Sequence, residues 1–211
     1  LTEVIVNVMP RVLVLTSGHE VIEPGESLTA GKIYNSNRAM ICGLLEDLGF
    51  HKITHYHVSD APEELESEIN HVLQLSEDAD IIISSGGVSV GLFDTMPLIY
   101  EKLGAKSIYA RIQMRPGAAS YGAVTPKGQI IFGLSGNPGA AFNGWHLIVA
   151  PTLKRYKGLK NWTTPVVACV MDSEIFKRNA FDRYVQGKVI FGGGAPRFVA
   201  NRHFNSSSML G

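Results

Sequence analysis

The feature that most constrains the fold is the alternation of short apolar segments with segments of helical periodicity. Residues 11–16 form an apolar run, helical spacing follows over residues 35–48, and an almost wholly apolar run occupies residues 80–84. A run of this kind is typical of a strand that helices cover on both faces. The alternation therefore predicts βαβ units, an α/β fold class and a parallel sheet.

Further segments extend the pattern toward residue 158. We expect an edge strand at 52–58, a helix that opens at Pro62, a helix at about 94–103, strands at 107–113, 119–124 and 129–134, and a long helical stretch at about 140–157. Pro151 lies inside that last stretch, and we expect it to kink or split the helix. After Gly158 the sequence predicts short strands without helices between them.

The stretch "SSGGVSVGLFD", Ser84–Asp94, follows the second apolar run. The carboxyl end of a parallel strand that turns into a helix presents unpaired N–H groups and a dipole that favours an anion. Gly86 and Gly87 would let a ligand approach the backbone, and Ser85 and Ser89 would add hydroxyl donors. The stretch matches neither the dinucleotide fingerprint nor a P-loop. Two interpretations stay open, an anion or phosphate site and a tight structural turn.

Other residues also leave alternatives. Asp94 suits either a helix N-cap or a carboxylate that holds Mg²⁺ beside phosphates. Arg115 suits either an anion clamp or a solvated loop position. The segment "LSGNPGAA", Leu134–Ala141, is a second glycine-bearing strand-to-helix turn. Because carboxyl-end turns of one parallel sheet share an edge, both turns are expected to face one cleft.

Composition excludes some classes of function. The 19 basic residues balance 19 acidic ones, which argues against a nucleic-acid partner. Apolar runs stay below 18 residues and no signal peptide is found, so we expect neither a membrane span nor secretion. Cys42 in a predicted helix and Cys169 in a predicted strand are expected to be reduced thiols. His55 and His57 share one face of an edge strand, but a metal site would need more ligands.

Several of these stretches together resemble one family. The segments are "TSGHEVIEPGESLTAGKIYNSN", "ADIIISSGGVSVGLFD", "MRPGAAS" and "GLSGNPGAA", and "GGGAPRFVANRHFNSSSML" resembles a C-terminal β domain. They are similar to motifs of the molybdopterin molybdotransferases, which include the E domain of gephyrin, and "SSGGVSVGLFD" matches almost residue for residue. The likeness runs from about Arg11 to Leu210.

The resemblance implies a function and a domain organisation. Proteins of this family insert molybdate into adenylylated molybdopterin and release AMP, with Mg²⁺. We therefore expect a cytoplasmic transferase of molybdenum cofactor biosynthesis, a homodimer in its full-length form, with other proteins of that pathway as partners. We expect a linker from a missing N-terminal domain at 1–9, a three-layer αβα molybdopterin-binding domain at 10–158, and a partial C-terminal β domain at 159–211.

The resemblance also implies roles for particular residues. Positions that match acidic or basic residues near the reaction centre are expected to be catalytic: Glu20, Asp60, Asp94 and Arg115. Two of them, Glu20 and Asp94, are also expected to hold Mg²⁺. Positions in the matching loops are expected to bind pterin or nucleotide: Thr16, Ser17, Gly18, Ser85, Gly86, Gly87, Val88, Ser89, Pro116, Gly117, Ser135, Gly136, Asn137 and Pro138.

The sequence departs from the family pattern at four places. Histidine replaces the usual aspartate at His19, serine replaces a proline at Ser135, and glycine replaces a common valine at Gly139. Ala118 and Ala119 replace a stretch of the pattern that includes a lysine, so that one anion contact is lost. These departures keep two alternatives open: a non-catalytic molybdopterin-binding homologue, and a domain of the related molybdopterin adenylyltransferase type. The β segment after Gly158 argues against the second.

Overall fold

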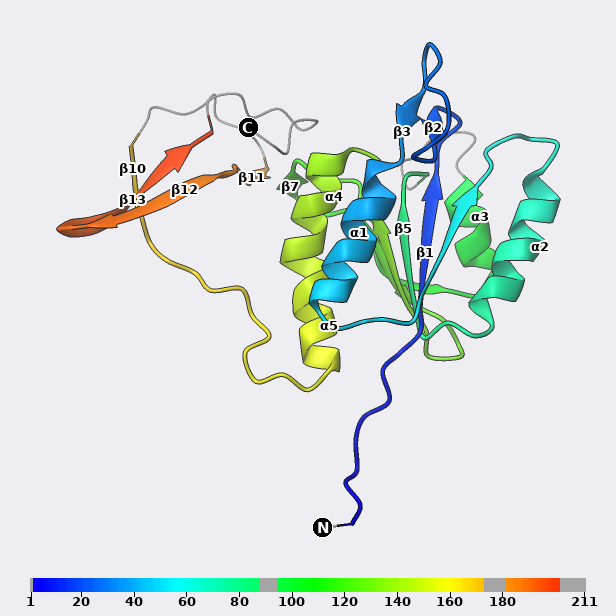
Figure 1. Ribbon diagram of the computed structural model, residues 1–211, viewed down its shortest axis with the longest axis horizontal. Helices are drawn as coiled ribbons and strands as arrows, with labels where there is room; N and C mark the ends of the chain where they lie inside the picture. Colours follow the sequence, from blue (N-terminus) through cyan, green and yellow to red (C-terminus); the bar gives the residue numbers. More distant parts are fainter. Residues whose placement is uncertain (1, 88–94, 173–180, 202–211) are drawn as a thin grey trace.

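The computed structural model describes residues 2–87, 95–172 and 181–201 (Figure 1). A six-stranded sheet lies at its centre, with the order β4-β1-β5-β9-β8-β6. Its strands are β1 (Val12–Ser17), β4 (Ile53–Val58), β5 (Ile81–Ser85), β6 (Lys106–Tyr109), β8 (Tyr121–Val124) and β9 (Ile130–Leu134). The strands β4, β1, β5 and β9 are parallel to one another, whereas β8 is antiparallel to both of its neighbours, β9 and β6. The predicted mostly parallel sheet, with β4 at its edge, is therefore confirmed.

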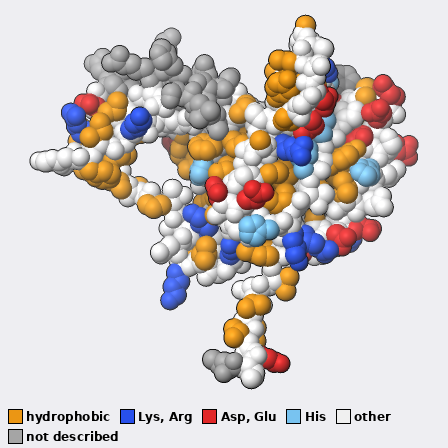
Figure 2. Space-filling model, in the orientation of Figure 1, with side chains coloured by type: hydrophobic (Ala, Val, Ile, Leu, Met, Phe, Trp, Pro, Cys, Tyr) orange, Lys and Arg blue, Asp and Glu red, His pale blue; other side chains and the backbone are white. Residues whose placement is uncertain are grey.

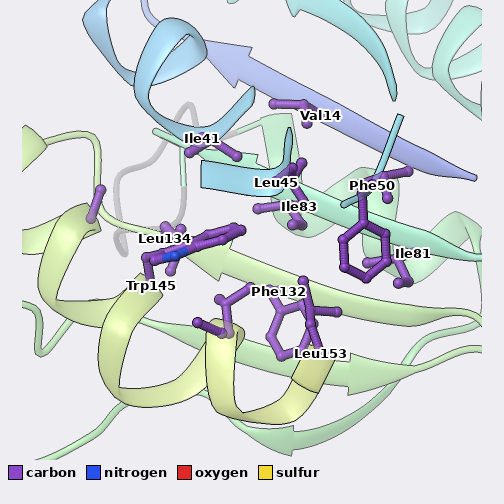
Figure 3. Close-up of a cluster of buried hydrophobic side chains, with 14 residues drawn as sticks. Val14, Ile41, Leu45, Phe50, Ile81, Ile83, Phe132, Leu134, Trp145 and Leu153 are labelled. Atoms are coloured by element: carbon purple, nitrogen blue, oxygen red, sulfur yellow. The ribbon is translucent and has the colours of Figure 1, made fainter. Parts of the chain in front are cut away.

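Helices cover both faces of this sheet (Figure 1). One face carries α1 (Ser36–Asp47), α4 (Pro138–Gly144), the π-helix η1 (Trp145–Val149) and α5 (Ala150–Tyr156), and the other carries α2 (Leu65–Ser76) and α3 (Thr95–Lys102). The alternation of side chains along β1 divides the core accordingly. Val12 and Val14 pack toward α1 and α4, while Leu13 and Leu15 pack toward α2 and α3. Figure 3 shows the first of these clusters, in which Trp145 lies beside Leu134.

Two helix boundaries reflect local chemistry. The helix expected from Pro62 begins only at Leu65, because residues 62–64 form a turn with hydrogen bonds from Glu64 N to Ala61 O and from Leu65 N to Pro62 O. The long helix that contains Pro151 is split, as expected, into α4, η1 and α5. Proline lacks an N–H donor and crowds the carbonyl four residues before it, and the wider π turn at residues 145–149 accommodates both effects.

The segment after Gly158 adds short strands. β10 (Val170–Met171), β12 (Gly187–Gly192) and β13 (Gly194–Ala200) form a three-stranded sheet, and β11 (Asp182–Arg183) pairs with β7 (Met114–Arg115) of the first region. Large apolar side chains on β12, such as Ile190 and Phe191, are exposed. Figure 2 shows hydrophobic side chains gathered on the surface of this part of the molecule. Cys169 precedes β10 instead of lying within a strand, and both cysteines are free. Among the described residues, no helix is long and apolar enough to cross a membrane.

A short pair of strands, β2 (Val21–Ile22) and β3 (Ile33–Tyr34), follows β1. In Figure 1 this pair and its loop project beyond the carboxyl ends of the parallel strands. Gly18 lies between β1 and β2 with a positive φ of 139°, and a Cβ atom there would lie 3.0 Å from Glu20 Oε2. The turn therefore holds the Glu20 side chain close to the end of β1, which is where the candidate site lies.

Candidate functional site

A cleft of about 1070 Å³ opens at the carboxyl ends of the parallel strands. Both predicted glycine-bearing turns border it, since its lining includes Ser85, Gly86 and Gly87 after β5 and Ser135 and Gly136 after β9. The prediction that the two turns face one cleft is confirmed. The β2–β3 pair forms another wall, and residues after β1 and β4 complete the lining.

Gly86 and Gly87 are needed for packing against the end of β1. Their φ values are 88° and 59°. A Cβ atom on Gly86 would lie 2.5 Å from the carbonyl oxygen of Ser17, and one on Gly87 would lie 2.8 Å from Ser17 Oγ. Real side chains do not tolerate such distances, so glycine lets the turn after β5 lie directly against β1. The tight-turn interpretation is thus supported, and it brings Ser17 to the cleft floor.

Asn37, on the first turn of α1, ties the two glycine-bearing turns together. Its Nδ2 donates to Ser85 Oγ and to the carbonyl oxygen of Gly136, both at 2.8 Å. Ser85 Oγ in turn donates to the carbonyl oxygen of Ser135 at 3.1 Å. The hydroxyl hydrogen of Ser85 is therefore already used, and its first role is to join β5 to β9. Asn37 is not among the residues predicted for the site, although a polar residue on the buried face of a helix is a signal that marks such a role.

Two buried polar atoms of this floor have no hydrogen-bond partner among the residues that the structure describes. They are Ser17 Oγ and Asn37 Oδ1, and both residues line the cleft. The orientation of the Asn37 amide is fixed, because a carbonyl oxygen can only accept and the Nδ2 atom must therefore face Gly136. A buried polar atom without a partner costs about 1–3 kcal/mol, so such atoms mark places where a ligand or an ordered water completes the bonding.

The charged groups of the cleft wall are acidic. Glu20 and Asp60 line it together with His19 and His57, and the lining within the described residues contains neither lysine nor arginine. Asp60 Oδ1 accepts a hydrogen bond from Thr95 Oγ1 at 3.4 Å. Asp60 is not the cap of α2, because the N-cap of that helix is Glu64. Glu20 Oε2 lies 3.6 Å from His19 Nδ1.

A polar network lies behind the wall, at the end of β1. Thr16 Oγ1 accepts from Asn35 Nδ2 at 2.9 Å and lies within hydrogen-bond distance of His55 and His57. Burial, and then the nearby charge of Arg38, lower the pKa of His55 to about 4.

Glu23 lies at the other end of this network. It accepts from Asn35 Nδ2 at 2.8 Å and pairs with Arg38. Burial raises the pKa of Glu23, but hydrogen bonds from Asn35 and Arg38 and the Arg38 charge outweigh burial and lower it. Glu23 is therefore a carboxylate near neutral pH.

Not all predicted site residues meet at the cleft. Those that line it are Thr16, Ser17, Gly18, Glu20, Asp60, Ser85, Gly86, Gly87, Ser135, Gly136 and Pro138. Val88, Ser89 and Asp94 lie outside the described residues. The remaining four, which are Arg115, Pro116, Gly117 and Asn137, do not appear in its lining.

The four remaining residues belong to the surrounding structure. Arg115 is exposed on β7, where its backbone lies opposite that of Arg183 in the pairing of β7 with β11. A Cβ atom on Gly117 would lie 2.4 Å from Met114 Cε, so this glycine makes room for a side chain. Asn137 is the N-cap of α4 and accepts from the backbone N–H of Ala140 at 3.3 Å. From the same segment as Arg115, it is Ala119 that lines the cleft.

Metal ligands do not cluster within the described residues. No group of three or more histidine, cysteine, aspartate or glutamate side chains there is placed to hold a metal ion. His55 and His57 do share one face of β4, as predicted, but both contact the hydroxyl group of Thr16. A metal site at this pair of histidines is therefore not supported.

Comparison with known proteins gives one consistent result. A family described as a probable molybdopterin binding domain matches residues 13–155. A molybdopterin molybdenumtransferase of Staphylococcus aureus (strain MRSA252) is 37% identical over 186 residues, which is 88% of this chain and 43% of that protein. The chain thus spans less than half the length of this curated relative.

Solved structures agree on the fold. The crystal structure of the molybdopterin biosynthesis MoeA protein from Pyrococcus horikoshii has a TM-score of 0.68 at 23% identity, over 91% of this chain and 45% of that one. The molybdopterin biosynthesis Mog protein from Mycobacterium ulcerans has a TM-score of 0.53 at 19% identity, over 71% of this chain and 97% of that one. At these identities the likeness concerns the fold alone.

Proposed function

Because this chain belongs to the molybdopterin-binding domain family, we propose that its cleft binds adenylylated molybdopterin. The proposed reaction is the insertion of molybdate into that ligand with release of AMP, a transferase step of molybdenum cofactor biosynthesis. The curated relative carries the name molybdopterin molybdenumtransferase, and this chain matches less than half of its length. The activity is therefore proposed for the protein to which this stretch of sequence belongs.

The observation that carries the proposal is the floor of the cleft. Asn37 joins the two glycine-bearing turns, and Ser17 Oγ and Asn37 Oδ1 are buried there with no hydrogen-bond partner in the described part of the chain. A hydroxyl group and an amide oxygen suit a ligand that has both acceptors and donors. A phosphorylated pterin has both, since its phosphate accepts and its amino groups donate.

Mg²⁺ is proposed as the cation that accompanies the phosphate groups, held by Glu20 and Asp94. Asp94 lies outside the described residues, so the support comes from Glu20 and Asp60. Their carboxylates line a cleft wall in which the described residues include neither lysine nor arginine. Phosphate and carboxylate groups repel each other unless a cation lies between them, and Mg²⁺ prefers oxygen ligands. When bound, it would offset the phosphate charge. Glu20 and Asp60 would orient the cation and the attacking oxygen.

A non-catalytic molybdopterin-binding homologue is the second candidate. Ala119 lines the cleft at a stretch where the family pattern supplies a lysine. The described lining contains no lysine or arginine that could replace that charge. The loss of one cation near an oxyanion removes about 1.5–3 kcal/mol of charge-assisted hydrogen bonding. An adenylyltransferase-type domain is less well supported, because β10, β12 and β13 follow the αβα layers.

The organisation of the chain is part of the proposal. We propose that residues 10–158 form the molybdopterin-binding domain, that 159–211 are part of a C-terminal β domain, and that 1–9 link to a preceding domain. The exposed apolar side chains of β12 support a further covering layer beyond this chain. We also propose a homodimer, a cytoplasmic location and other proteins of the same pathway as partners.

The test is AMP release from adenylylated molybdopterin, measured with and without molybdate. Release that depends on molybdate and Mg²⁺, and that falls in Glu20→Gln, would support the transferase. Glu66→Gln, an exposed change on α2, is the matched control and should leave release unchanged. Binding of the pterin without release would favour the non-catalytic homologue, and no binding would reject both.

A further inference from the structure

Two histidines of one strand share a single hydroxyl group beside the cleft. His55 and His57 are two residues apart on β4, so their side chains lie on the same face. His55 Nε2 lies 3.1 Å from Thr16 Oγ1, and His57 Nδ1 lies 3.2 Å from the same atom. Of the two histidines, His57 lines the cleft. The described part of the chain shows no hydrogen bond to the second ring nitrogen of His57, Nε2.

A third partner fixes how this hydroxyl group is used. Asn35 Nδ2 donates to Thr16 Oγ1 and also to the carboxylate of Glu23, which can only accept. Asn35 Oδ1 accepts from the backbone N–H of Arg38 at 3.1 Å, so the amide cannot be reversed. A hydroxyl group has one hydrogen and two lone pairs. With one lone pair filled by Asn35, one hydrogen and one lone pair remain for the two imidazole rings.

We propose that His55, Thr16 and His57 form a coupled proton relay, in which His57 presents to the cleft a ring nitrogen whose protonation follows the tautomer of His55. In one state His57 carries its proton on Nδ1 and donates to Thr16, which donates to His55 Nε2. In the other state His55 donates from Nε2 to Thr16, and Thr16 donates to His57 Nδ1. When both rings are neutral, both carry a proton on Nδ1 in the first state, and both carry it on Nε2 in the second.

The two states interconvert without a change in the number of protons on the relay. A proton that His57 Nε2 takes up from water or ligand in the cleft is matched by one that the half-buried His55 releases from Nδ1 to solvent water. Between them, the Nδ1 proton of His57 passes to Thr16, and the hydroxyl proton of Thr16 passes to His55 Nε2. Because burial and Arg38 lower the pKa of His55 to about 4, that ring takes part as a neutral tautomer near pH 7.

The relay deepens the proposed function and rests on it for the nature of the ligand. A phosphate oxygen in the cleft accepts hydrogen bonds, so it selects the state in which His57 Nε2 carries a hydrogen. His57 is then a ligand-contacting residue, and Thr16 and His55 are positioning residues. The cleft wall has no described lysine or arginine, which makes an imidazole N–H donor more important there.

Nuclear magnetic resonance of ¹⁵N-histidine-labelled protein near neutral pH tests the relay directly, because ring nitrogen shifts distinguish the two tautomers. We expect His55 and His57 to show the same tautomer, and both to show Nε2–H after saturation with AMP. Thr16→Ser, which keeps the hydroxyl group, should preserve this pairing, whereas Thr16→Val should abolish it. Opposite tautomers at the two rings of the unmodified protein would overturn the proposal, and this reading needs no variant to fold.

Binding measurements provide the second readout. His57→Asn keeps a nitrogen near the Nδ1 position and removes Nε2, so the Kd for AMP should rise about three- to tenfold, the loss of one hydrogen bond. Thr16→Val should also weaken AMP binding, and Thr16→Ser, which keeps the hydroxyl group, should restore the Kd. The exposed His51→Asn is the matched control. An unchanged Kd in His57→Asn would overturn the proposal.

If the unmodified chain binds neither AMP nor adenylylated molybdopterin, the proposed function fails. The tautomers of the free protein still decide the relay in that case: matched tautomers support it, and mixed tautomers overturn it.

Discussion

The side-chain amide nitrogen of Asn37 lies 2.8 Å from the carbonyl oxygen of Gly136, although 99 residues separate them in the chain. The same nitrogen donates to Ser85 Oγ, so one side chain on α1 holds the ends of β5 and β9 together. The two glycine-bearing turns are thus parts of one preformed cleft floor.

Replacement of Asn37 should destabilise the fold as well as the site. Asn37→Ala leaves Gly136 O and Ser85 Oγ without their donor, and we expect a loss of about 1–3 kcal/mol in the free energy of unfolding. Asn37→Asp should cost more, because a carboxylate places lone pairs against a carbonyl oxygen. Urea unfolding measures both. The exposed Asn70→Ala on α2 should change stability by less than about 0.5 kcal/mol. Equal stability of Asn37→Ala and Asn70→Ala would contradict this account of the floor.

Gly86→Ala should be more harmful than the same change at another glycine of positive φ. Gly86 and Gly25 have φ values of 88° and 104°, but a Cβ atom meets Ser17 O at 2.5 Å in the first case and only open space in the second. Gly25→Ala therefore reports the backbone strain alone. We expect Gly86→Ala to lower the free energy of unfolding by about 1–3 kcal/mol more than Gly25→Ala. Thermal unfolding of the two variants measures this difference. A loss of stability in Gly86→Ala no larger than that in Gly25→Ala would show that the turn adjusts to the added Cβ atom.

Stability should fall as the pH drops from about 6.5 toward 4. The folded pKa of His55 is about 4, below its ordinary value of 6.5, so the unfolded chain binds more protons in this window. The contribution of His55 is complete above pH 6.5 and is lost as the pH falls, with a slope of at most about 1.4 kcal/mol per pH unit. His55→Gln should flatten the profile in this window. A His55→Gln profile as steep as that of the unmodified protein would contradict the lowered pKa.

Ala119→Lys should strengthen molybdate binding. Ala119 lines the cleft and Ala118 does not, so a lysine at residue 119 places its charge inside the lining. One charge-assisted hydrogen bond corresponds to about a tenfold lower Kd. Ala118→Lys is the neighbouring control and should have a smaller effect. No gain in Ala119→Lys would indicate that flanking domains, and not charge, limit molybdate binding.

The fold could be predicted from the sequence because apolar runs and helical periodicity are local signals. The strand at residues 81–85 and the division of the helix around Pro151 both follow from side chains within a few residues. The helix after Pro62 begins later than expected, because residues 62–64 form a turn before it.

The candidate site was predictable only in part. The two glycine-bearing turns could be placed together, since one edge of a parallel sheet gathers them. The role of Asn37, the place of Ala119 and the sharing of Thr16 by two histidines depend on residues distant in sequence. Arg115 matches a basic motif position, yet it lies exposed on β7, the strand that pairs with β11. A motif identifies the residue type and leaves its orientation to the tertiary structure.

The most direct test of the central claim is calorimetric titration of adenylylated molybdopterin into this chain, with and without Mg²⁺. We expect saturable binding that Mg²⁺ strengthens. Glu20→Gln should abolish the Mg²⁺ effect, and the exposed Glu66→Gln should preserve it. No heat of binding to the unmodified chain, or binding that Ser17→Ala, Asn37→Ala and Glu20→Gln all leave unchanged, would contradict the claim that this cleft is the ligand site.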